Sequence, residues 1–368
     1  MALTKGDDYP IHQTSEPIAY AGTDRNFYDR YFFNGYAMEG DAFFALAFGV
    51  YPHLNIADAA FSLVEDGVQT SLHASRWLNM ERMDLAVGPI AIDVLEPLRK
   101  LKLTVDAPDR GLRAEIVFQG RAFPVEEPRF IRRNGPRAFM DYTRLSQNGR
   151  YAGWVELDGR RASVDGFMGT RDRSWGVRPV GARDPQEVIP PQPPQFYWIW
   201  SPANFAAGSF FFHSNEDASG LAWNRRAVWA REGVDAAGLD ENPDCAIAID
   251  WKSGTRHARR AVVSLKDAAG AREIVYEPAY EFFMLGLGYG HPKWGHGLAH
   301  GPLTVEREDL TLSDVDVRLP QHLHVQAPCK VTYRHAGGRE AVGRGVLEQL
   351  VIGPHTPSGF AEILDFAK

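Results

Sequence analysis

The segment GTRDRSWGVRPVG, residues 169–181, concentrates side chains that can do acid–base chemistry. Asp172 could donate a proton or position a water molecule, and Arg171 and Arg173 flank it and could tune it or hold a polar end of a substrate. Cations beside a carboxyl lower its pKa, whereas burial against an aromatic ring such as Trp175 raises it. The sequence does not decide between these effects. The same segment also fits a purely structural role, in which Asp172 only accepts hydrogen bonds.

A second group of reactive side chains lies in GLGYGHPKWGHGLAHG, residues 286–301. The spacing of His291, His296 and His300 suits three metal ligands only if the loop folds favourably. Because the cysteines and carboxylates of a strong zinc motif are missing around them, we expect no metal. We expect an ordered glycine-rich loop that caps a cavity, with Trp294 at the substrate and His296 as a second proton carrier.

Two further runs predict strands whose alternate side chains could line a pocket. In QFYWIWSP, Tyr197 falls on one face and Trp200 on the other. This run is either a core strand or an aromatic wall that binds an apolar chain or stabilises a cation, so both residues are candidate substrate contacts. In SLHASRW, His73 and Arg76 fall on opposite faces, and we expect one of these faces to look into a barrel.

The elements that must position these groups are short antiparallel strands. Alternating apolar and polar residues in 59–78, 101–120 and 151–169 predict hairpins. Turn residues support two of them, Glu65-Asp66-Gly67 in the first and Asp158-Gly159 in the last. Helical periodicity is almost absent. Many short strands at roughly ten-residue spacing indicate an all-β barrel or sandwich.

The chain is too long for one ordinary core, which suggests about two domains. Residues 183–196 contain five prolines, so they can form neither a helix nor a central strand. We therefore expect a β-barrel domain over residues 1–182, a proline-rich linker over residues 183–195 and a second β-barrel domain over residues 196–368. We expect the charged segment at the end of the first domain to face a cavity at the domain junction.

Composition excludes several classes of protein. A hydrophobic content of 44% with 24% charged residues is typical of a soluble globular protein, and a net charge of −7 argues against nucleic-acid binding. Two cysteines, Cys245 and Cys329, give no disulfide framework and are expected to be buried thiols. We see no secretory leader and no apolar run of about 18 residues, so we expect a cytoplasmic protein without an integral membrane segment.

Several familiar catalytic motifs are missing. We find no GxxxxGK[ST], no GxGxxG in a βαβ unit, no HExxH and no GxSxG. These absences argue against a nucleotide cofactor and against serine-hydrolase chemistry, and we expect an activity without a cofactor.

The run G-x-R-D-x-S-W-G-x-R, the proline-rich link and the strand FYWIW together resemble the tandem-lipocalin group. That group includes carotenoid 1,2-hydratase, kievitone hydratase, AttH-like proteins and the fungal decalin-forming Diels–Alderases. The chain is most similar to a bacterial branch with RDRSWG and a later HPxWGHG, matched here by residues 291–297. The hydratases carry a histidine in the first run, close to D-H-x-W-G, where this chain has Arg173 and Ser174. That departure puts a direct transfer of catalytic residues in doubt.

The resemblance implies two lipocalin-like, calycin-type antiparallel β-barrels side by side, with a ligand pocket between or within them. It also implies a hydrophobic substrate, often a polyene or an isoprenoid. Our leading hypothesis is therefore a cofactor-independent hydratase, isomerase or cyclase, a lyase or isomerase that acts on an unsaturated isoprenoid, polyene or steroid-like molecule.

Two other hypotheses remain open at this point. One is a non-catalytic carrier of a lipid, steroid or aromatic ligand, which needs the same aromatic cavity but no proton donor. The other is a pericyclase, in which the cavity only folds the substrate. The sequence does not give the substrate or the direction of a reaction, and it is compatible with a homodimer without deciding the oligomeric state.

Overall fold

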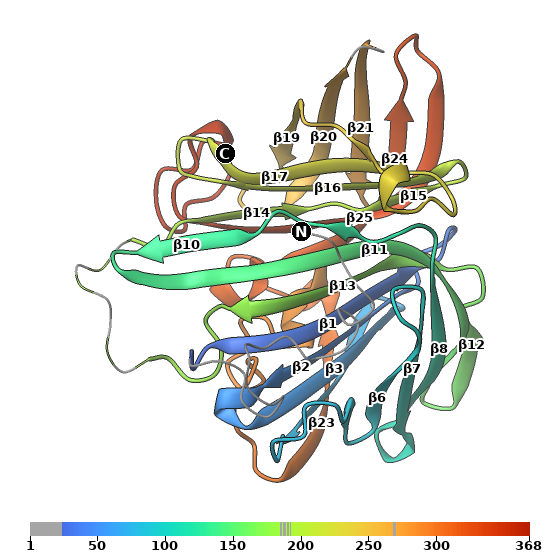
Figure 1. Ribbon diagram of the computed structural model, residues 1–368, viewed down its shortest axis with the longest axis vertical. Coiled ribbons are helices and arrows are strands. Elements are labelled where there is room, and N and C mark those ends of the chain that lie inside the picture. The colour runs from blue at the N-terminus through green and yellow to red at the C-terminus, as the bar shows by residue number, and fades with distance from the viewer. Residues whose placement is uncertain (1–23, 185, 187–188, 190, 192, 268–269) are drawn as a thin grey trace. The chain divides into compact units, whose positions relative to one another are not determined.

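The computed structural model describes residues 24–368 apart from 185, 187–188, 190, 192 and 268–269 (Figure 1). It divides into two compact units with separate hydrophobic cores. Unit 1 consists of Met1–Pro191 and Gly286–Thr311, and unit 2 consists of Gln192–Leu285 and Leu312–Lys368. The described residues form strands and short 3-10 turns, and they contain no helix long and apolar enough to cross a membrane. The predicted all-β class is confirmed.

Unit 1 is built on a 14-stranded sheet whose pairings are all antiparallel. The main path runs in the order β23-β4-β3-β2-β1-β13-β11-β8-β7-β6-β5, and β9, β10 and β12 pair with β11. The strands are β1 (Phe27–Tyr36), β2 (Phe43–Tyr51), β3 (Ile56–Glu65), β4 (Val68–Trp77), β5 (Ala86–Val87), β6 (Ile90–Glu96), β7 (Lys100–Ala107), β8 (Leu112–Gly120), β9 (Val125–Glu126), β10 (Phe130–Asn134), β11 (Arg137–Leu157), β12 (Arg160–Ser163), β13 (Met168–Val177) and β23 (Leu303–Thr311).

The hairpin predicted in residues 59–78 is present as β3 and β4. Asp66 and Gly67 both take positive φ, 51° and 76°, as a two-residue hairpin turn of the primed type requires. The turn sets the register, so that Asp58 lies opposite Ser75 and Ala60 lies opposite His73. This register decides which side chains share a face of the hairpin.

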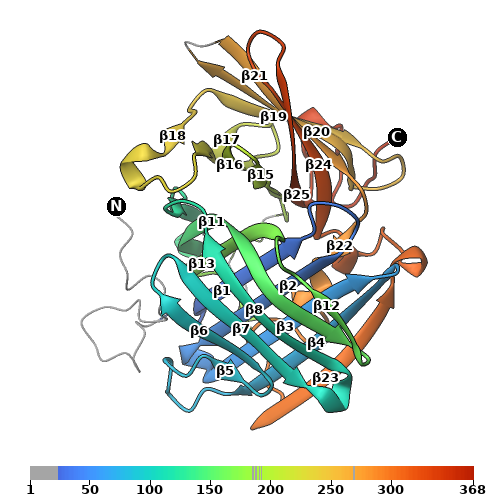
Figure 2. The ribbon, with the colours of Figure 1, turned by 90° about the vertical axis from the view of Figure 1, so that its right-hand side faces the viewer.

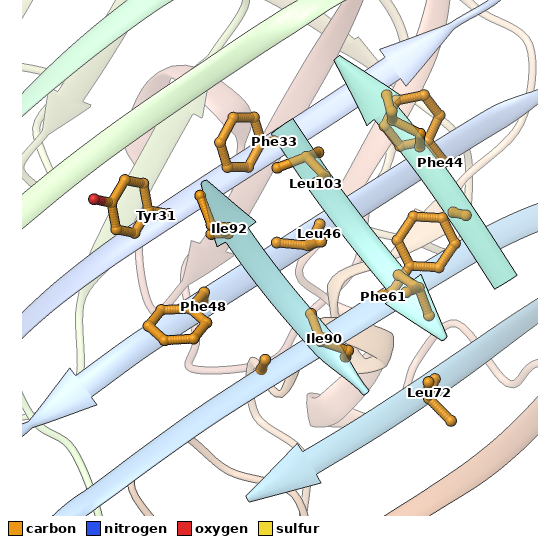
Figure 3. Close-up of a cluster of buried hydrophobic side chains, with 14 of the residues drawn as sticks. Tyr31, Phe33, Phe44, Leu46, Phe48, Phe61, Leu72, Ile90, Ile92 and Leu103 are labelled. Atoms are coloured by element: carbon orange, nitrogen blue, oxygen red, sulfur yellow. The ribbon is translucent and has the colours of Figure 1, made fainter. Parts of the chain in front are cut away.

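The interior of unit 1 is filled by apolar side chains from alternate strand positions (Figure 3). Phe44, Leu46 and Phe48 point inward from β2 and meet side chains from the facing strands, such as Ile92 and Leu103. Burial of each such side chain contributes about 1.5–3 kcal/mol. The sheet curls into a nearly closed barrel, in which Arg76 Nε of β4 donates a hydrogen bond to the carbonyl oxygen of Ala86 in β5 (2.7 Å).

The domain boundaries in the structure differ from those expected from the sequence. Residues 286–311 lie within the range predicted for the second domain, but they group with unit 1. There β23 runs antiparallel along β4, from Leu303 opposite Arg76 to Thr311 opposite Val68 (Figure 2). The chain thus leaves unit 2, adds a loop and a strand to unit 1, and returns. Strand pairing across more than two hundred residues leaves no local pattern in the sequence.

The charged segment at 169–181 is mostly strand and not a loop. Residues 168–177 form β13, which lies in the centre of the unit 1 sheet between β1 and β11. Because side chains alternate along a strand, neighbours in this segment point to opposite faces. The clustering of charge in the sequence is therefore not a clustering in space.

Unit 2 is built on an 11-stranded sheet in the order β18-β17-β16-β14-β25-β24-β21-β20-β19, with β15 and β22 off this path. Its core contains both Cys245 and Cys329, which are free buried thiols as predicted. The strands are β14 (Phe196–Trp200), β15 (Ala203–Phe205), β16 (Gly208–Glu216), β17 (Ala222–Ala230), β18 (Asp240–Glu241), β19 (Cys245–Trp251), β20 (Ala258–Asp267), β21 (Gly270–Pro278), β22 (Phe282–Phe283), β24 (Val325–Arg334) and β25 (Glu340–Ile352).

Candidate functional site

The barrel side of β13 carries a buried ion-pair network. Arg173 donates to the carboxylate of Asp29 and, through Nη1, to the carbonyl oxygen of Arg30 (2.9 Å). Its guanidinium lies 4.1 Å from the ring centroid of Tyr31, and Arg82 Nη2 is 3.7 Å from the other oxygen of Asp29. The side chains of Arg173, Asp29 and Arg82 are fully buried. Charges buried this deeply need one another, so this network supports a structural role for Arg173.

Arg171 and Trp175 lie on the same side of β13 as Arg173. Arg171 is buried, donates from Nε to Oε1 of Gln147 (2.7 Å) and lies 5.7 Å from the ring centroid of Phe118. Trp175 is only partly buried and lies opposite Asp29 in the register with β1. Neither residue shares a strand face with Asp172.

Asp172 points to the outer face of β13, where other arginines surround it. It lies opposite Phe32 of β1, and the next position on its face, Ser174, lies opposite Arg30 and Arg144. Its charge stabilises both of these guanidinium groups and helps to raise their pKa against the lowering effect of burial. The charge of Asp172 therefore acts on Arg30 and Arg144, which belong to the neighbouring strands β1 and β11.

Arg30 interacts electrostatically with Asp172 and with a second carboxylate on the same outer face, that of Asp58. Burial alone would lower the pKa of Arg30, but the pKa is raised because four oxygen-bearing side chains face the cation. These are, in decreasing order of effect, Tyr51, Tyr289, Asp58 and Asp172. Arg30 is 3% exposed, and its Nη1 has no hydrogen-bond partner. A buried donor in this state is available to a water molecule or a ligand.

A small cavity lies near Asp58, between the β3–β4 hairpin and the loop at 286–301. Its volume is about 10 Å³, which is room for about one water molecule. Its polar lining consists of Asp58, His73, Ser75, Trp294, His296 and His300.

Asp58 is held in the cavity wall by two hydrogen bonds. Its Oδ1 accepts from the hydroxyl of Tyr51 (3.0 Å) and its Oδ2 accepts from the backbone N–H of Gly297 (2.7 Å). Burial raises the pKa of Asp58, and the opposing effects of Arg30 and of these two hydrogen bonds do not cancel that rise. A carboxyl in such a place is disposed to hold a proton.

His73 also lines the cavity, and its pKa is shifted in the opposite direction to that of Asp58. It stacks on the indole of Trp294, with ring centroids 5.4 Å apart and planes 9° from parallel. Burial lowers the pKa of His73 although Glu308, 3.5 Å from its Nε2, acts in the opposite sense. In return the hydrogen bond to His73 lowers the pKa of Glu308 to about 2, with help from His291. His73 is therefore disposed to remain neutral beside an ionised Glu308.

Two nitrogen atoms around the cavity are buried without a hydrogen-bond partner, Nε1 of Trp294 and Nε2 of His300. Nε2 of His73 instead faces Glu308 at 3.5 Å. The rings of Trp294 and His300 contact each other, with centroids 4.3 Å apart. Unsatisfied buried polar atoms are costly, and a water molecule in the cavity would satisfy them. The chemistry of the lining thus fits a bound water between Asp58 and His73.

His296 contributes to the cavity wall, but both of its ring nitrogens are engaged. Nδ1 accepts from Arg178 Nη2 (3.0 Å) and Nε2 donates to the carbonyl oxygen of Leu287 (2.9 Å). Gly288, with φ at 89°, allows this close approach, because a Cβ there would lie 2.9 Å from the imidazole. In this arrangement His296 holds the loop in place, and its predicted role as a second proton carrier stays a prediction.

The histidines of the loop do not meet as a metal site. His291 instead joins His73 and Glu308, with ligand atoms within 4.8 Å of one another. However, Nδ1 of His291 accepts the backbone N–H groups of Lys293 (3.0 Å) and Trp294 (2.8 Å). The imidazole proton must then sit on Nε2, which donates to Glu308 (2.8 Å). A metal needs a free lone pair at that nitrogen, so this group does not fit a metal ion.

The remaining predicted site residues, Arg76, Tyr197 and Trp200, are not among the residues that line the cavity. Arg76 holds the strand ends together through Ala86 and through Asp84, 3.0 Å from its Nη2. Tyr197 and Trp200 belong to unit 2 and point to opposite faces of β14, as predicted. Tyr197 lies in the core of unit 2, and Trp200 contacts Phe211 on the other face with centroids 6.3 Å apart.

Sequence reasoning missed Asp58, Ser75 as a cavity residue, and Glu308. The run IADAAFSLVE gives a signal for Asp58, since it interrupts an otherwise apolar strand. Glu308 gives no such signal, because it stands in a run of four charged residues, 306–309, as is common on an edge strand.

The chain matches a family of unknown function, DUF8625, over residues 3–361. The protein belongs to this family. Among curated proteins no match to this DUF8625 member is found.

Two solved structures share the fold of this DUF8625 protein. The AttH-like protein NE1406 of Nitrosomonas europaea is 14% identical with a TM-score of 0.51, and the match covers 91% of this chain and 97% of that one. CghA, solved with Sch210972, is 11% identical with a TM-score of 0.54, and the match covers 94% and 95%. At these identities the similarity shows the fold alone. The predicted lipocalin-like, all-β fold class is thereby confirmed.

Proposed function

We propose that the protein is a cofactor-independent enzyme that uses acid–base chemistry on a hydrophobic unsaturated small molecule, as a hydratase, isomerase or cyclase. The observation that carries this proposal is the opposite displacement of two pKa values in one cavity wall: Asp58 is shifted up and His73 is shifted down. Both shifts favour the uncharged forms, a carboxylic acid and a neutral imidazole. Such a pair can give and take a proton at the same pH.

In this proposal Asp58 is the acid and His73 is the base. Asp58 gives its proton to a carbon of the double bond, and the cavity water adds its oxygen to the resulting cation. His73 removes a proton from that water, and exchange with solvent restores Asp58. Trp294 Nε1 and His300 Nε2 hold the water, and Glu308 orients His73. In an isomerase the same base removes a proton from carbon and no water is added.

Arg30 and Asp172 are assigned supporting roles. The unpartnered Nη1 of Arg30 is a donor for a polar end of the substrate. Asp172 helps Tyr51, Tyr289 and Asp58 to hold that guanidinium in place. We also propose that the protein belongs to the bacterial branch of the tandem-lipocalin group with the RDRSWG and HPxWGHG motifs.

Substrate access requires the loop at 286–301 to move, because the cavity holds about one water molecule. The loop is fastened to unit 1 by the Gly297 N–H at Asp58 and by His291 at Glu308. Both fastenings involve the proposed catalytic cluster. Binding of the substrate is thereby coupled to exposure of the acid.

The experiment that tests this proposal is extraction of the purified protein with organic solvent, followed by mass spectrometry of the extract. Any compound recovered, together with farnesol, retinol, squalene and lycopene as probes, is incubated with the protein in a mixture of D₂O and H₂¹⁸O. Gain of both labels supports a hydratase, and gain of deuterium alone supports an isomerase or proton-dependent cyclase. A product without either label supports a pericyclase, and a compound that binds but stays unchanged supports a carrier.

A further inference from the structure

A second cluster of reactive side chains lies in unit 2, whereas the cavity lies in unit 1. The proposed function does not use this cluster. The imidazole of His355 lies between Ser358 and Glu216: Nδ1 is 2.7 Å from the hydroxyl of Ser358, and Nε2 is 3.1 Å from Oε2 of Glu216. An ionised Glu216 can only accept, so Nε2 carries the proton and Nδ1 accepts from the hydroxyl. This is the proton arrangement of a serine–histidine–acid triad with the two ring nitrogens exchanged.

The base is held rigidly. Oε1 of Glu216 accepts hydrogen bonds from Ser214 Oγ (2.9 Å) and from Arg225 Nη2 (2.7 Å). Burial acts to raise the pKa of Glu216, but the hydrogen bonds from His355, Ser214 and Arg225 outweigh it and lower the pKa. The ring of Tyr197 stacks on His355 with centroids 4.1 Å apart. Glu216 therefore stays ionised, and the imidazole has one orientation.

The serine stands at the surface while its base is buried. His355 and Glu216 are buried, whereas Ser358 is half-buried in a 3-10 turn, Thr356–Ser358, whose neighbouring residues are exposed. The turn is fixed by the Thr356 N–H, which donates to the carbonyl oxygen of Ala218 (2.8 Å). Pro357 packs closely on Gly220, because a Cβ added to Gly220 would lie only 2.4 Å from the proline ring. Ser358 is therefore the member of this cluster that is nearest to solvent.

We propose that Ser358, His355 and Glu216 form a nucleophilic site that accepts acyl groups from small activated esters. The Ser358 oxygen bonds to the ester carbonyl carbon, and the hydroxyl proton passes to Nδ1 of His355. The bond from that carbon to the leaving oxygen breaks, and the alcohol or phenol departs with the proton. Water then attacks the acyl-serine by the same route and releases the acid.

The surrounding backbone sets the speed of this reaction. The N–H groups of Ser358, Gly359 and Phe360 all donate within the turn, to the carbonyl oxygens of His355 and Thr356. They do not form an oxyanion hole, which in serine hydrolases contributes about 10²–10³ in rate. The site is therefore expected to acylate once with good leaving groups and to turn over slowly.

Labelling with a fluorophosphonate probe, followed by intact-mass and peptide mass spectrometry, tests the proposal. We expect a single adduct on Ser358, at least tenfold faster than on Ser313, an exposed serine that bonds to Asp314 and has no histidine. Ser358→Ala should abolish the adduct and the burst of p-nitrophenol from p-nitrophenyl acetate, whereas Ser313→Ala should change neither. Glu216→Gln should slow labelling at least tenfold.

Absence of an adduct on Ser358, or labelling of Ser358 no faster than of Ser313, would overturn the proposal and leave the hydroxyl as a structural cap on His355. Because wild-type protein gives this answer alone, the result does not depend on the folding of a variant. Failure here would leave the acid–base proposal for unit 1 untouched, since the two clusters share no residue.

Discussion

Asp58 and His73 are diagonal neighbours on one face of the β3–β4 hairpin: Asp58 lies opposite Ser75, and His73 lies opposite Ala60. In an antiparallel pair such positions are about 7–8 Å apart or slightly less. That spacing leaves a gap that one water molecule can bridge, which agrees with the cavity between them. The hairpin register thus places an acid and a base on either side of a water site.

The raised pKa of Asp58 predicts a pH-dependent cost to stability. The folded protein binds the Asp58 proton more tightly than the unfolded chain does, so its contribution is favourable below the unfolded pKa of about 4 and is lost as the pH rises through the folded value. Asp58→Asn removes this dependence and retains most of the hydrogen bonding. Relative to that variant, the wild-type free energy of unfolding should fall as the pH rises above about 4.

Urea denaturation at a series of pH values between 4 and 8 measures this difference. Asp93→Asn, which changes an exposed aspartate on β6, is the matched control and should parallel the wild type. If both variants follow the wild-type curve, the carboxyl of Asp58 titrates normally and is not the acid.

Asp172 is predicted to matter for activity through Arg30. Asp172→Asn removes a negative charge that helps to hold the Arg30 cation of the neighbouring strand β1, and substrate turnover should fall at least tenfold. The decisive readout is turnover per folded molecule, with folding checked by circular dichroism. A folded Asp172→Asn protein with full turnover would show that Asp172 has a structural role only.

The buried pair of Arg173 and Asp29 predicts a large loss of stability for Arg173→Met. The substitution leaves the Asp29 carboxylate buried with a weaker set of partners, and the loss should be about 3–5 kcal/mol. Arg160→Met, which breaks an exposed pair with Glu65, should cost less than about 1 kcal/mol. Chemical denaturation of both variants gives the comparison, and equal small losses would argue against a buried network.

Gly288 is predicted to be irreplaceable in the loop at 286–301. A Cβ there would lie 2.6 Å from the carbonyl oxygen of Trp294 and 2.9 Å from His296, in a backbone conformation with φ at 89°. Gly288→Ala should therefore displace the loop and lower the melting temperature. Gly301→Ala has similar strain at φ 94° but open space around the Cβ, and it should have the smaller effect. Equal shifts for the two variants would mean that the loop is not tightly seated.

The hairpins, the all-β class and the opposite faces of Tyr197 and Trp200 could be predicted from the sequence, because they follow from local alternation and turn residues. The grouping of Asp172 with Arg30, Arg144 and Asp58 on the outer face could not be predicted in this way. The sequence suggested that Arg171 and Arg173 tune Asp172, whereas the alternation of side chains along the central strand β13 places them on the opposite face.

The cavity also depends on long-range pairing. The loop at 286–301 reaches His73 because β23 pairs with β4, and no local sequence pattern predicts that pairing. Trp294 was selected from its motif, but its stacking on His73 joins residues more than two hundred positions apart. Asp58 was missed because its outward-facing position is covered by the loop at 286–301, and a single polar residue in an apolar strand gives no sign of that cover.

The most direct test of the central claim is the rate of label uptake from D₂O and H₂¹⁸O into the bound compound, measured for wild type, Asp58→Asn, His73→Gln and the Asp93→Asn control. Removal of a general acid or base costs about 10²–10⁴ in rate. We predict that Asp58→Asn and His73→Gln lose at least a hundredfold while Asp93→Asn keeps the wild-type rate. Equal uptake by all four proteins, or a compound that binds to wild type and takes up no label, would contradict acid–base catalysis by this pair.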